Sequence, residues 1–215
     1  FGVGFKSVFG ICDTVKLYSQ PNNYYGDYGD AVPFAVEIVD FTSPVDIEAQ
    51  ELSKTITTKF VFPYTVGRSF SGFKNIDELN NTLSLKLQNL GITTLLFMKN
   101  LEIIEYKICL TEKAIEGEYL LDKKIINDHC SLISAIGLSD KKTEEEEKIE
   151  EISYLKFSKV LNNLSNRTVD IAFPVQIKED GSYECKTPQT PYVSVYFPTE
   201  KESKLGFIVQ GPYRT

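Results

Sequence analysis

The chain has no tryptophan, one methionine, one histidine and four cysteines. The cysteines are Cys12, Cys109, Cys130 and Cys185, and no two of them form a C-x-x-C pair. This spacing favours neither a zinc site nor a disulfide framework, and a single histidine excludes a His-rich metal cluster. His129 precedes Cys130, but adjacent side chains point in different directions and no third group orients them for nucleophilic catalysis. We therefore predict no metal-binding or catalytic residue and a protein of the reducing cytoplasm.

The chain also lacks a long apolar run and an excess of positive charge. No apolar segment reaches the length of a membrane-spanning helix and no signal-peptide pattern is present, so we expect no membrane partner. Asp and Glu number 30 against 23 Lys and Arg, which gives a net charge of −7. Because phosphate contacts need clustered Lys and Arg, this balance argues against a broad nucleic-acid surface.

The first ten residues carry the clearest chemical signal: Phe-Gly-Val-Gly-Phe-Lys-Ser-Val-Phe-Gly. Two glycines separated by one residue let the backbone bend without a Cβ clash and let amide groups approach an anion. A helix-like run from Phe5 to Ile11 would direct its positive N-terminal end to the same place. Lys6 adds a positive charge that suits a terminal phosphate. An ordinary turn into a buried helix would use the same two glycines, so this spacing alone does not decide the function.

The wider string resembles the second glycine box of the GHKL (Bergerat-fold) ATPases. Its Gly-Phe-Lys-Ser-Val version, followed by Ile-Cys-Asp-Thr and an apolar strand, is most similar to the sacsin-like branch, which is chaperone-like and related to the ninety-kilodalton heat-shock chaperones. In that superfamily the box closes over the triphosphate of ATP. The resemblance implies cofactor binding by the loop Gly2, Val3, Gly4, Phe5 and Lys6, with backbone amides from Gly2, Gly4 and Phe5 and a side-chain contact from Lys6.

A second similarity lies at residues 54–63, which resemble the last conserved element of the same nucleotide fold. There a threonine begins a central strand and reaches the adenine edge, and Thr58 matches it best. A β-branched residue favours a strand in any case. The family has glycine before that threonine where this chain has Thr57, which leaves the match open by one residue in either direction. Residues 90–102 also resemble the sacsin-like branch, so the resemblance covers residues 1–108.

The resemblance further implies what the parent protein carries upstream. The superfamily's Mg²⁺-holding Asn and catalytic Glu lie on its first helix, and its adenine-binding Asp lies in its first glycine box. Hydrolysis needs Mg²⁺ held by oxygen atoms and a positioned base. We therefore expect a fragment that starts inside the second glycine box and does not hydrolyse ATP alone, while ATP hydrolysis by the parent stays open. The expected partners are ATP with Mg²⁺, the rest of the parent polypeptide, and a protein client or a second copy.

For the fold we expect the α+β class. Residues 1–110 would form the C-terminal part of a Bergerat-type α/β sandwich, a mixed sheet packed on helices. Residues 111–215 would form a smaller α/β module of the transducer type. A chain of 215 residues with 42% hydrophobic side chains has room for both. The acidic run within residues 140–151 is expected to be a solvated helix start or a mobile loop.

Local patterns predict the individual elements. A helix is expected over residues 75–91, with Asn75 as N-cap, Glu78 completing a capping box and Gly91 as terminator. A second helix is expected over residues 145–162. Strands are expected over residues 14–19, 34–39, 57–62, 93–98, 103–110, 168–177, 192–197 and 207–209, with a hairpin turn at residues 179–181.

Two rival functions stay open. The first is a pseudo-ATPase or structural scaffold whose glycine turn serves only packing. The second is the ATPase module of a nucleic-acid-processing or defence protein, which salt-dependent DNA binding would favour. Asp27 and Asp30 fit a solvated loop better than a cation site. Arg214 is either the positive residue that the family directs at the nucleotide or a surface arginine.

Overall fold

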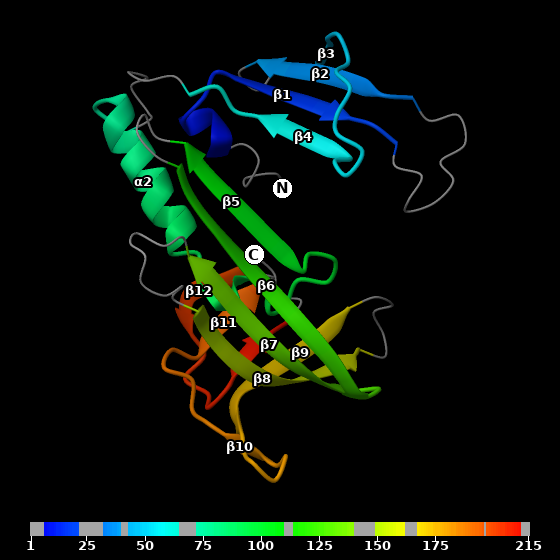
Figure 1. Cartoon of the computed structure of the whole chain (residues 1–215), viewed down its shortest axis with the longest axis vertical. Coiled ribbons are helices and arrows are strands. Elements are labelled where there is room, and N and C mark those ends of the chain that lie inside the picture. Colours follow the sequence, from blue (N-terminus) through cyan, green and yellow to red (C-terminus); the bar gives the residue numbers. More distant parts are fainter. Residues whose placement is uncertain are drawn as a thin grey trace. The chain divides into compact units, whose positions relative to one another are not determined.

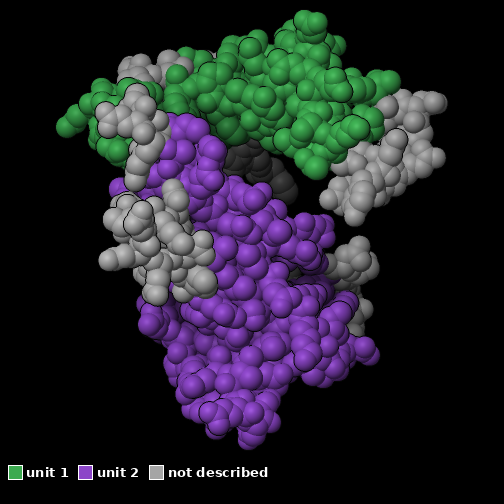
Figure 2. Space-filling view, in the orientation of Figure 1, with its two compact units in different colours: residues 1–82 green, residues 83–215 purple. Residues whose placement is uncertain are grey.

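A computed structural model describes residues 7–21, 32–39, 43–64, 72–109, 114–139, 149–161, 167–195 and 197–211. The chain divides into two compact units, residues 1–82 and residues 83–215 (Figure 2). Figure 1 shows that strands dominate, and the described residues contain one α-helix. The domain boundary that the family resemblance predicts after residue 110 is distinct from this division into units. It stays a prediction.

Unit 1 (residues 1–82) contains a four-stranded antiparallel sheet. Its strands are β1 (Thr14–Ser19), β2 (Phe34–Val39), β3 (Val45–Asp46) and β4 (Thr58–Val61), in the spatial order β3-β2-β1-β4. A short 3₁₀ helix, η1 (Ser7–Gly10), precedes β1. The strands predicted over residues 14–19 and 34–39 are confirmed, and the strand predicted over 57–62 is one residue shorter at each end.

Two small apolar clusters lie on opposite faces of this sheet. Val15 packs with Cys12 and with Phe9 of η1. Tyr18 packs with Ala35 and with Leu52, which comes from the segment between β3 and β4. Because Val15 and Tyr18 are three residues apart on one strand, their side chains leave opposite faces. Thus η1 covers one face of the sheet, and the segment that leads into β4 covers the other.

The helix α2 (Ile76–Gln88) begins where the sequence predicts and contains the boundary between the units. Asn75 Oδ1 accepts a hydrogen bond from the Glu78 N–H at 2.8 Å, as expected of an N-cap. The Glu78 carboxylate accepts from the N–H of Lys74, also at 2.8 Å, rather than from that of Asn75. The capping box is therefore present, but its return bond closes one residue earlier than predicted. Gly91 has φ +82°, a conformation that favours glycine.

Unit 2 (residues 83–215) is built on one curled sheet (Figure 1). Its strands are β5 (Ile103–Cys109), β6 (Ala114–Asn127), β7 (Cys130–Ser139), β8 (Ile149–Val160), β9 (Thr168–Ile177), β10 (Tyr183–Cys185), β11 (Tyr192–Val195), β12 (Phe197–Glu202) and β13 (Ile208–Gln210). The spatial order is β12-β11-β13-β9-β8-β7-β6-β5, and β10 pairs with β9. The β11–β13 pair is parallel and the other pairs are antiparallel. The hairpin turn predicted at residues 179–181 joins β9 to β10, with Gly181 at φ +79°.

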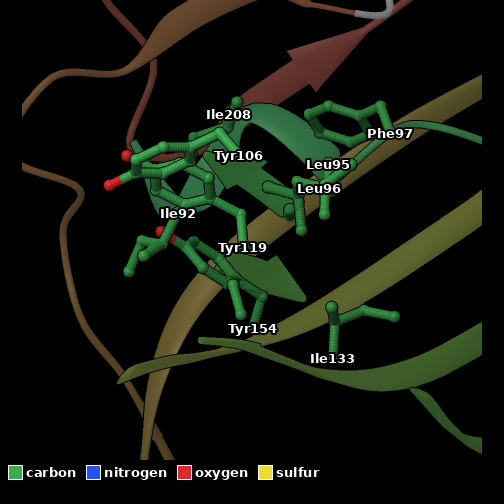
Figure 3. Close-up of a cluster of buried hydrophobic side chains, with 11 residues drawn as sticks. Ile92, Leu95, Leu96, Phe97, Tyr106, Tyr119, Ile133, Tyr154 and Ile208 are labelled. Carbon is green, nitrogen blue, oxygen red and sulfur yellow. The ribbon is translucent and has the colours of Figure 1, made fainter. Parts of the chain in front are cut away.

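The core of unit 2 lies where the 3₁₀ helix η2 (Ile92–Leu95) packs against one face of this sheet. Leu95, Leu96 and Phe97 are buried there with rings from β5, β6 and β8, and Figure 3 shows this cluster. The Tyr119 hydroxyl of β6 also lies 3.1 Å from the Leu87 carbonyl oxygen and 2.8 Å from that of Gln88. It thereby donates to the carbonyls at the end of α2 that have no partner within the helix.

The predicted α+β fold, a mixed sheet packed on helices, is wrong. Strands make up 52% and helices 13% of the described residues. The helix predicted over residues 145–162 is the strand β8, which pairs with β7 on one side and β9 on the other. The strand predicted over residues 93–98 contains η2 and a turn instead. The two long strands β6 and β7 lie in a region where no pattern predicted a strand.

Candidate functional site

The predicted phosphate loop, Gly2 to Lys6, lies outside the described residues, so the described part of the candidate site begins at Ser7. The helical run expected over residues 5–11 continues there as the single 3₁₀ turn of η1. The Val8 carbonyl accepts hydrogen bonds from the N–H groups of Ile11 at 3.0 Å and Cys12 at 3.1 Å. The Cys12 thiol donates to the same oxygen at 3.2 Å. These bonds fix the turn by which the segment after the loop enters β1.

Thr58, the predicted adenine-side residue, is the first residue of β4 and is exposed. It pairs with Ser19, the last residue of β1. The strand that follows the glycine box and the strand that starts at Thr58 are therefore direct neighbours. An exposed hydroxyl at a strand end is available to hydrogen-bond a ligand as donor or acceptor.

Gln20 holds the segment that leads to Thr58, and sequence reasoning did not single it out. Its amide nitrogen lies 3.3, 3.0 and 2.8 Å from the carbonyl oxygens of Leu52, Ser53 and Ile56. Its amide oxygen accepts from the Leu52 N–H at 3.1 Å, and its backbone N–H donates to the Thr57 carbonyl at 2.9 Å. No local sequence signal marks such a residue, because its partners lie more than thirty positions away. One side chain thus orders the approach to the candidate site.

The paired strands β1 and β4 each carry a lysine. Lys59 Nζ lies 5.9 Å from the centroid of the Tyr18 ring on the neighbouring strand. Between β1 and β2, Lys16 Nζ is 3.7 Å from Glu37 Oε1, and both groups are partly exposed. Such exposed interactions contribute little to stability. Of the two lysines, Lys59 directly follows Thr58 in the chain, whereas Lys16 pairs with Val61 at the other end of β4.

The structure gives the His129–Cys130 pair no catalytic geometry. His129 is exposed in the turn between β6 and β7, whereas Cys130 is buried at the start of β7. Burial raises the pKa of the Cys130 thiol, which disfavours the nucleophilic thiolate. The His129 backbone instead serves the fold, because its N–H donates to Asn127 Oδ1 at 2.9 Å and its carbonyl accepts from the Ser158 N–H at 2.9 Å.

Other candidates fall partly outside the structure. Asp27, Asp30, Arg214 and most of the acidic segment 140–151 lie outside the described residues. Within the described ranges, no group of three or more His, Cys, Asp or Glu side chains gathers as metal ligands. In the same ranges, no helix combines the length and the apolar character needed to cross a membrane.

Comparison of the chain with family models, curated proteins and solved structures finds no match.

Proposed function

We propose that this chain is part of an ATP-binding protein. In this proposal the loop Gly2, Val3, Gly4, Phe5 and Lys6 binds the β- and γ-phosphates, and Thr58 contacts the adenine edge. The parent protein supplies the Mg²⁺ ligand and the water-activating base from segments upstream of residue 1. ATP then acts as a conformational switch in a chaperone-like protein, whether or not the parent hydrolyses it.

The observation that carries the proposal is the pairing of β1 with β4. It makes the strand after the glycine box the direct neighbour of the strand that starts at the exposed Thr58. Three further features support it: the GHKL-like string at residues 1–9, the turn fixed by Val8, and the segment before Thr58 fixed by Gln20. None of them depends on the α+β sandwich that the structure corrects.

The proposal also includes a cellular compartment and a set of binding partners. The four cysteines are free in the structure, which supports a reducing compartment such as the cytoplasm. The partners would be the remainder of the parent chain and a protein client or a second copy. A net charge of −7 supports a protein partner over a nucleic acid.

The test is to titrate Mg²⁺-ATP into two purified proteins by calorimetry. One is the present chain, and the other extends upstream to include the first glycine box and the Asn/Glu helix. We expect saturable binding by the extended form and none by the present chain. A folded extended form that fails to bind would favour the scaffold alternative.

A pair of variants of the extended form tests the adenine contact. Thr58→Val should weaken ATP binding, whereas Thr57→Val, one residue earlier, should leave it unchanged. The reverse result would move the contact to Thr57, and no effect from either would remove it.

A further inference from the structure

One face of the unit 2 sheet is covered by η2. Its side chains are apolar beneath η2 and become polar further along the strands. Tyr154, Ala172 and Ile208 form part of the apolar cluster on this face (Figure 3). Two residues further along the same strands the face carries Lys156, Asp170 and Gln210. The strand register joins these residues to further polar ones: Ser131 pairs with Lys156, Ser158 with Asp170, Asp170 with Gln210, and Gln210 with Ser194. Lys156 itself pairs with Ala172, so Ser131 and Lys156 lie two residues along the strands from the line formed by Ser158, Asp170, Gln210 and Ser194. Side chains paired in this way leave the same face, and we call these two adjacent lines, which together span five strands, the polar row.

Lys156 supplies the positive charge of this row. Its Nζ donates to the Leu96 carbonyl at 3.1 Å and lies 5.3 Å from the centroid of the Phe97 ring. An ammonium group has three N–H donors, and only one of them has a hydrogen bond within the described residues. Burial lowers the pKa of Lys156, the Asp170 carboxylate raises it, and the ammonium groups of Lys123 and Lys99 lower it further. Three lysines therefore share one electrostatic neighbourhood.

Asp170 supplies a buried acceptor that is only partly used. It is 5% exposed, and its Oδ2 accepts one hydrogen bond, from Thr168 Oγ1 at 3.3 Å. Lys156 and Asp170 attract each other, yet within the described residues they do not form an ion pair. A carboxylate has room for about four hydrogen bonds. The buried carboxylate and the half-buried ammonium group thus both keep bonding capacity for a ligand.

Ser194 is a further buried polar side chain of this row, on β11, two strands from Asp170 and three strands from Lys156. It is 1% exposed, and its Oγ has no hydrogen-bond partner within the described residues. Ser194 lies in register with Gln210, which is itself buried beside Asp170.

We propose that this polar row binds hydrogen phosphate. Lys156 donates to its oxygens, and Lys99 and Lys123, both exposed, add positive charge around Lys156. Asp170 accepts the hydrogen bond from the protonated oxygen of the anion. The Asp170 carboxylate selects an oxyanion that still carries a proton. A fully ionised oxyanion would place its own acceptor oxygen against the acceptor oxygen of Asp170, with no hydrogen between them. This site is separate from the proposed ATP site.

The test is a titration of the whole chain with sodium phosphate, followed by amide chemical shifts, with sodium sulfate as the matched anion that carries no proton near neutral pH. We expect saturable shifts at residues around Lys156 and Asp170 with phosphate, and an affinity for sulfate at least about tenfold weaker. Lys156→Met should abolish phosphate binding, and Asp170→Asn should remove the preference for phosphate over sulfate.

A second set of variants avoids the interior, where a substitution can unfold the protein. Lys99→Met and Lys123→Met change exposed residues, and together they should weaken phosphate binding several-fold without changing the amide spectrum of the free protein. Lys124→Met is the control, because Lys124 neighbours Lys123 in sequence but leaves the opposite face of β6. Equal effects of Lys123→Met and Lys124→Met, or no saturable binding of phosphate, would overturn the proposal. Unchanged phosphate binding in Lys6→Ala would confirm that the two sites are separate.

Discussion

At the scale of single residues, Gln20 ties the end of β1 to the segment that leads into β4. Its amide bonds to Leu52, Ser53 and Ile56 replace the pairing that a strand would otherwise give that segment. Leu52 is buried against Tyr18 and Ala35, so the same contact also holds one of the two apolar clusters of unit 1. Gln20 is therefore a positioning residue for Thr58 in this account.

Removal of this amide should destabilise unit 1. Gln20→Ala leaves the Leu52 N–H and several carbonyls without their protein partner, and we expect a loss of about 1–2 kcal/mol in the free energy of unfolding. Gln88→Ala is the control, because the Gln88 amide makes one local bond, to the Ser84 carbonyl at 3.2 Å. Urea unfolding measures the free energies, and hydrogen exchange at the Leu52 amide localises the effect. Equal losses in both variants would contradict this role.

Lys156 makes the stability of unit 2 depend on pH in the alkaline range. Its pKa in the folded protein is lowered from the ordinary 10.5, chiefly by burial, so the unfolded chain binds its proton more tightly. Stability must then rise as pH increases from the folded pKa towards 10.5, because the unfolded state binds more protons in that window.

A comparison of wild type with Lys156→Met isolates this effect. We expect the unfolding free energy of wild type to rise relative to that of the variant as pH increases from the lowered pKa of Lys156 towards 10.5. The rise ends near 10.5, where the lysine of the unfolded chain also loses its proton, while the raised pKa of Tyr154 affects both proteins alike and cancels in the difference. Denaturant unfolding across that window measures the difference, and parallel pH profiles for the two proteins would refute the assignment.

At the scale of elements, β5 and β6 fit together through a glycine. Gly117 pairs with Tyr106, and a Cβ at position 117 would run into the Tyr106 ring. The Tyr106 ring therefore lies across the β6 backbone. Its centroid is 6.0 Å from the centroid of the Tyr119 ring.

Gly117→Ala should therefore destabilise unit 2 by about 1–3 kcal/mol, since the ring must move out of a packed cluster. Gly206→Ala serves as the control, because a Cβ at position 206 meets no atom within 4 Å and the residue has no positive φ. Thermal unfolding of the two variants measures the contrast. A Gly117→Ala protein as stable as Gly206→Ala would show that the ring has room to move.

The elements that the sequence predicts well have one clear period or a cap. The helix α2 has its N-cap at Asn75, and β1 and β9 have the bounds that their patterns predict. The unit 2 strands β6, β7 and β8 fail this test because apolar residues lie on both of their faces. Leu132 and Ile133, for example, are adjacent on β7 and leave opposite faces, which hides the two-residue alternation.

The error at η2 has a related cause. Leu95, Leu96 and Phe97 are consecutive and all buried, and a continuous apolar run of this kind predicts a buried strand as readily as a compact turn. A strand with one covered face cannot bury three side chains in succession, whereas the 3₁₀ turn directs them all into the cluster on the sheet. Only the tertiary contacts of unit 2 decide between the two.

For the candidate site, the sequence indicates which side chains could bind the ligand, and the structure shows which strands lie next to one another. Local pattern and family resemblance lead to Lys6 and Thr58, whereas the pairing of β1 with β4 comes from the structure alone. Gln20, Lys156 and Asp170 could not be found in this way. Their roles depend on partners in other strands or loops, and a single sequence holds no local signal for such contacts.

At the scale of the whole molecule, we propose a different ligand for each of the two compact units. Unit 1 includes the residues of the predicted phosphate loop and carries Thr58 on a four-stranded sheet. Unit 2 carries the polar row of Lys156 and Asp170 on its own curled sheet. Each unit has its own apolar clusters, so substitutions in one should leave the ligand affinity of the other unchanged.

The central claim, ATP binding through the glycine loop, is tested most directly by the affinity of the upstream-extended protein for Mg²⁺-ATP with and without the Lys6 side chain. The account predicts that Lys6→Ala binds at least about tenfold more weakly than wild type, because a charge-assisted contact to phosphate is lost. Lys16→Ala is the control, since Lys16 pairs with Glu37 on the sheet. Equal affinity of Lys6→Ala, Lys16→Ala and wild type would contradict the claim.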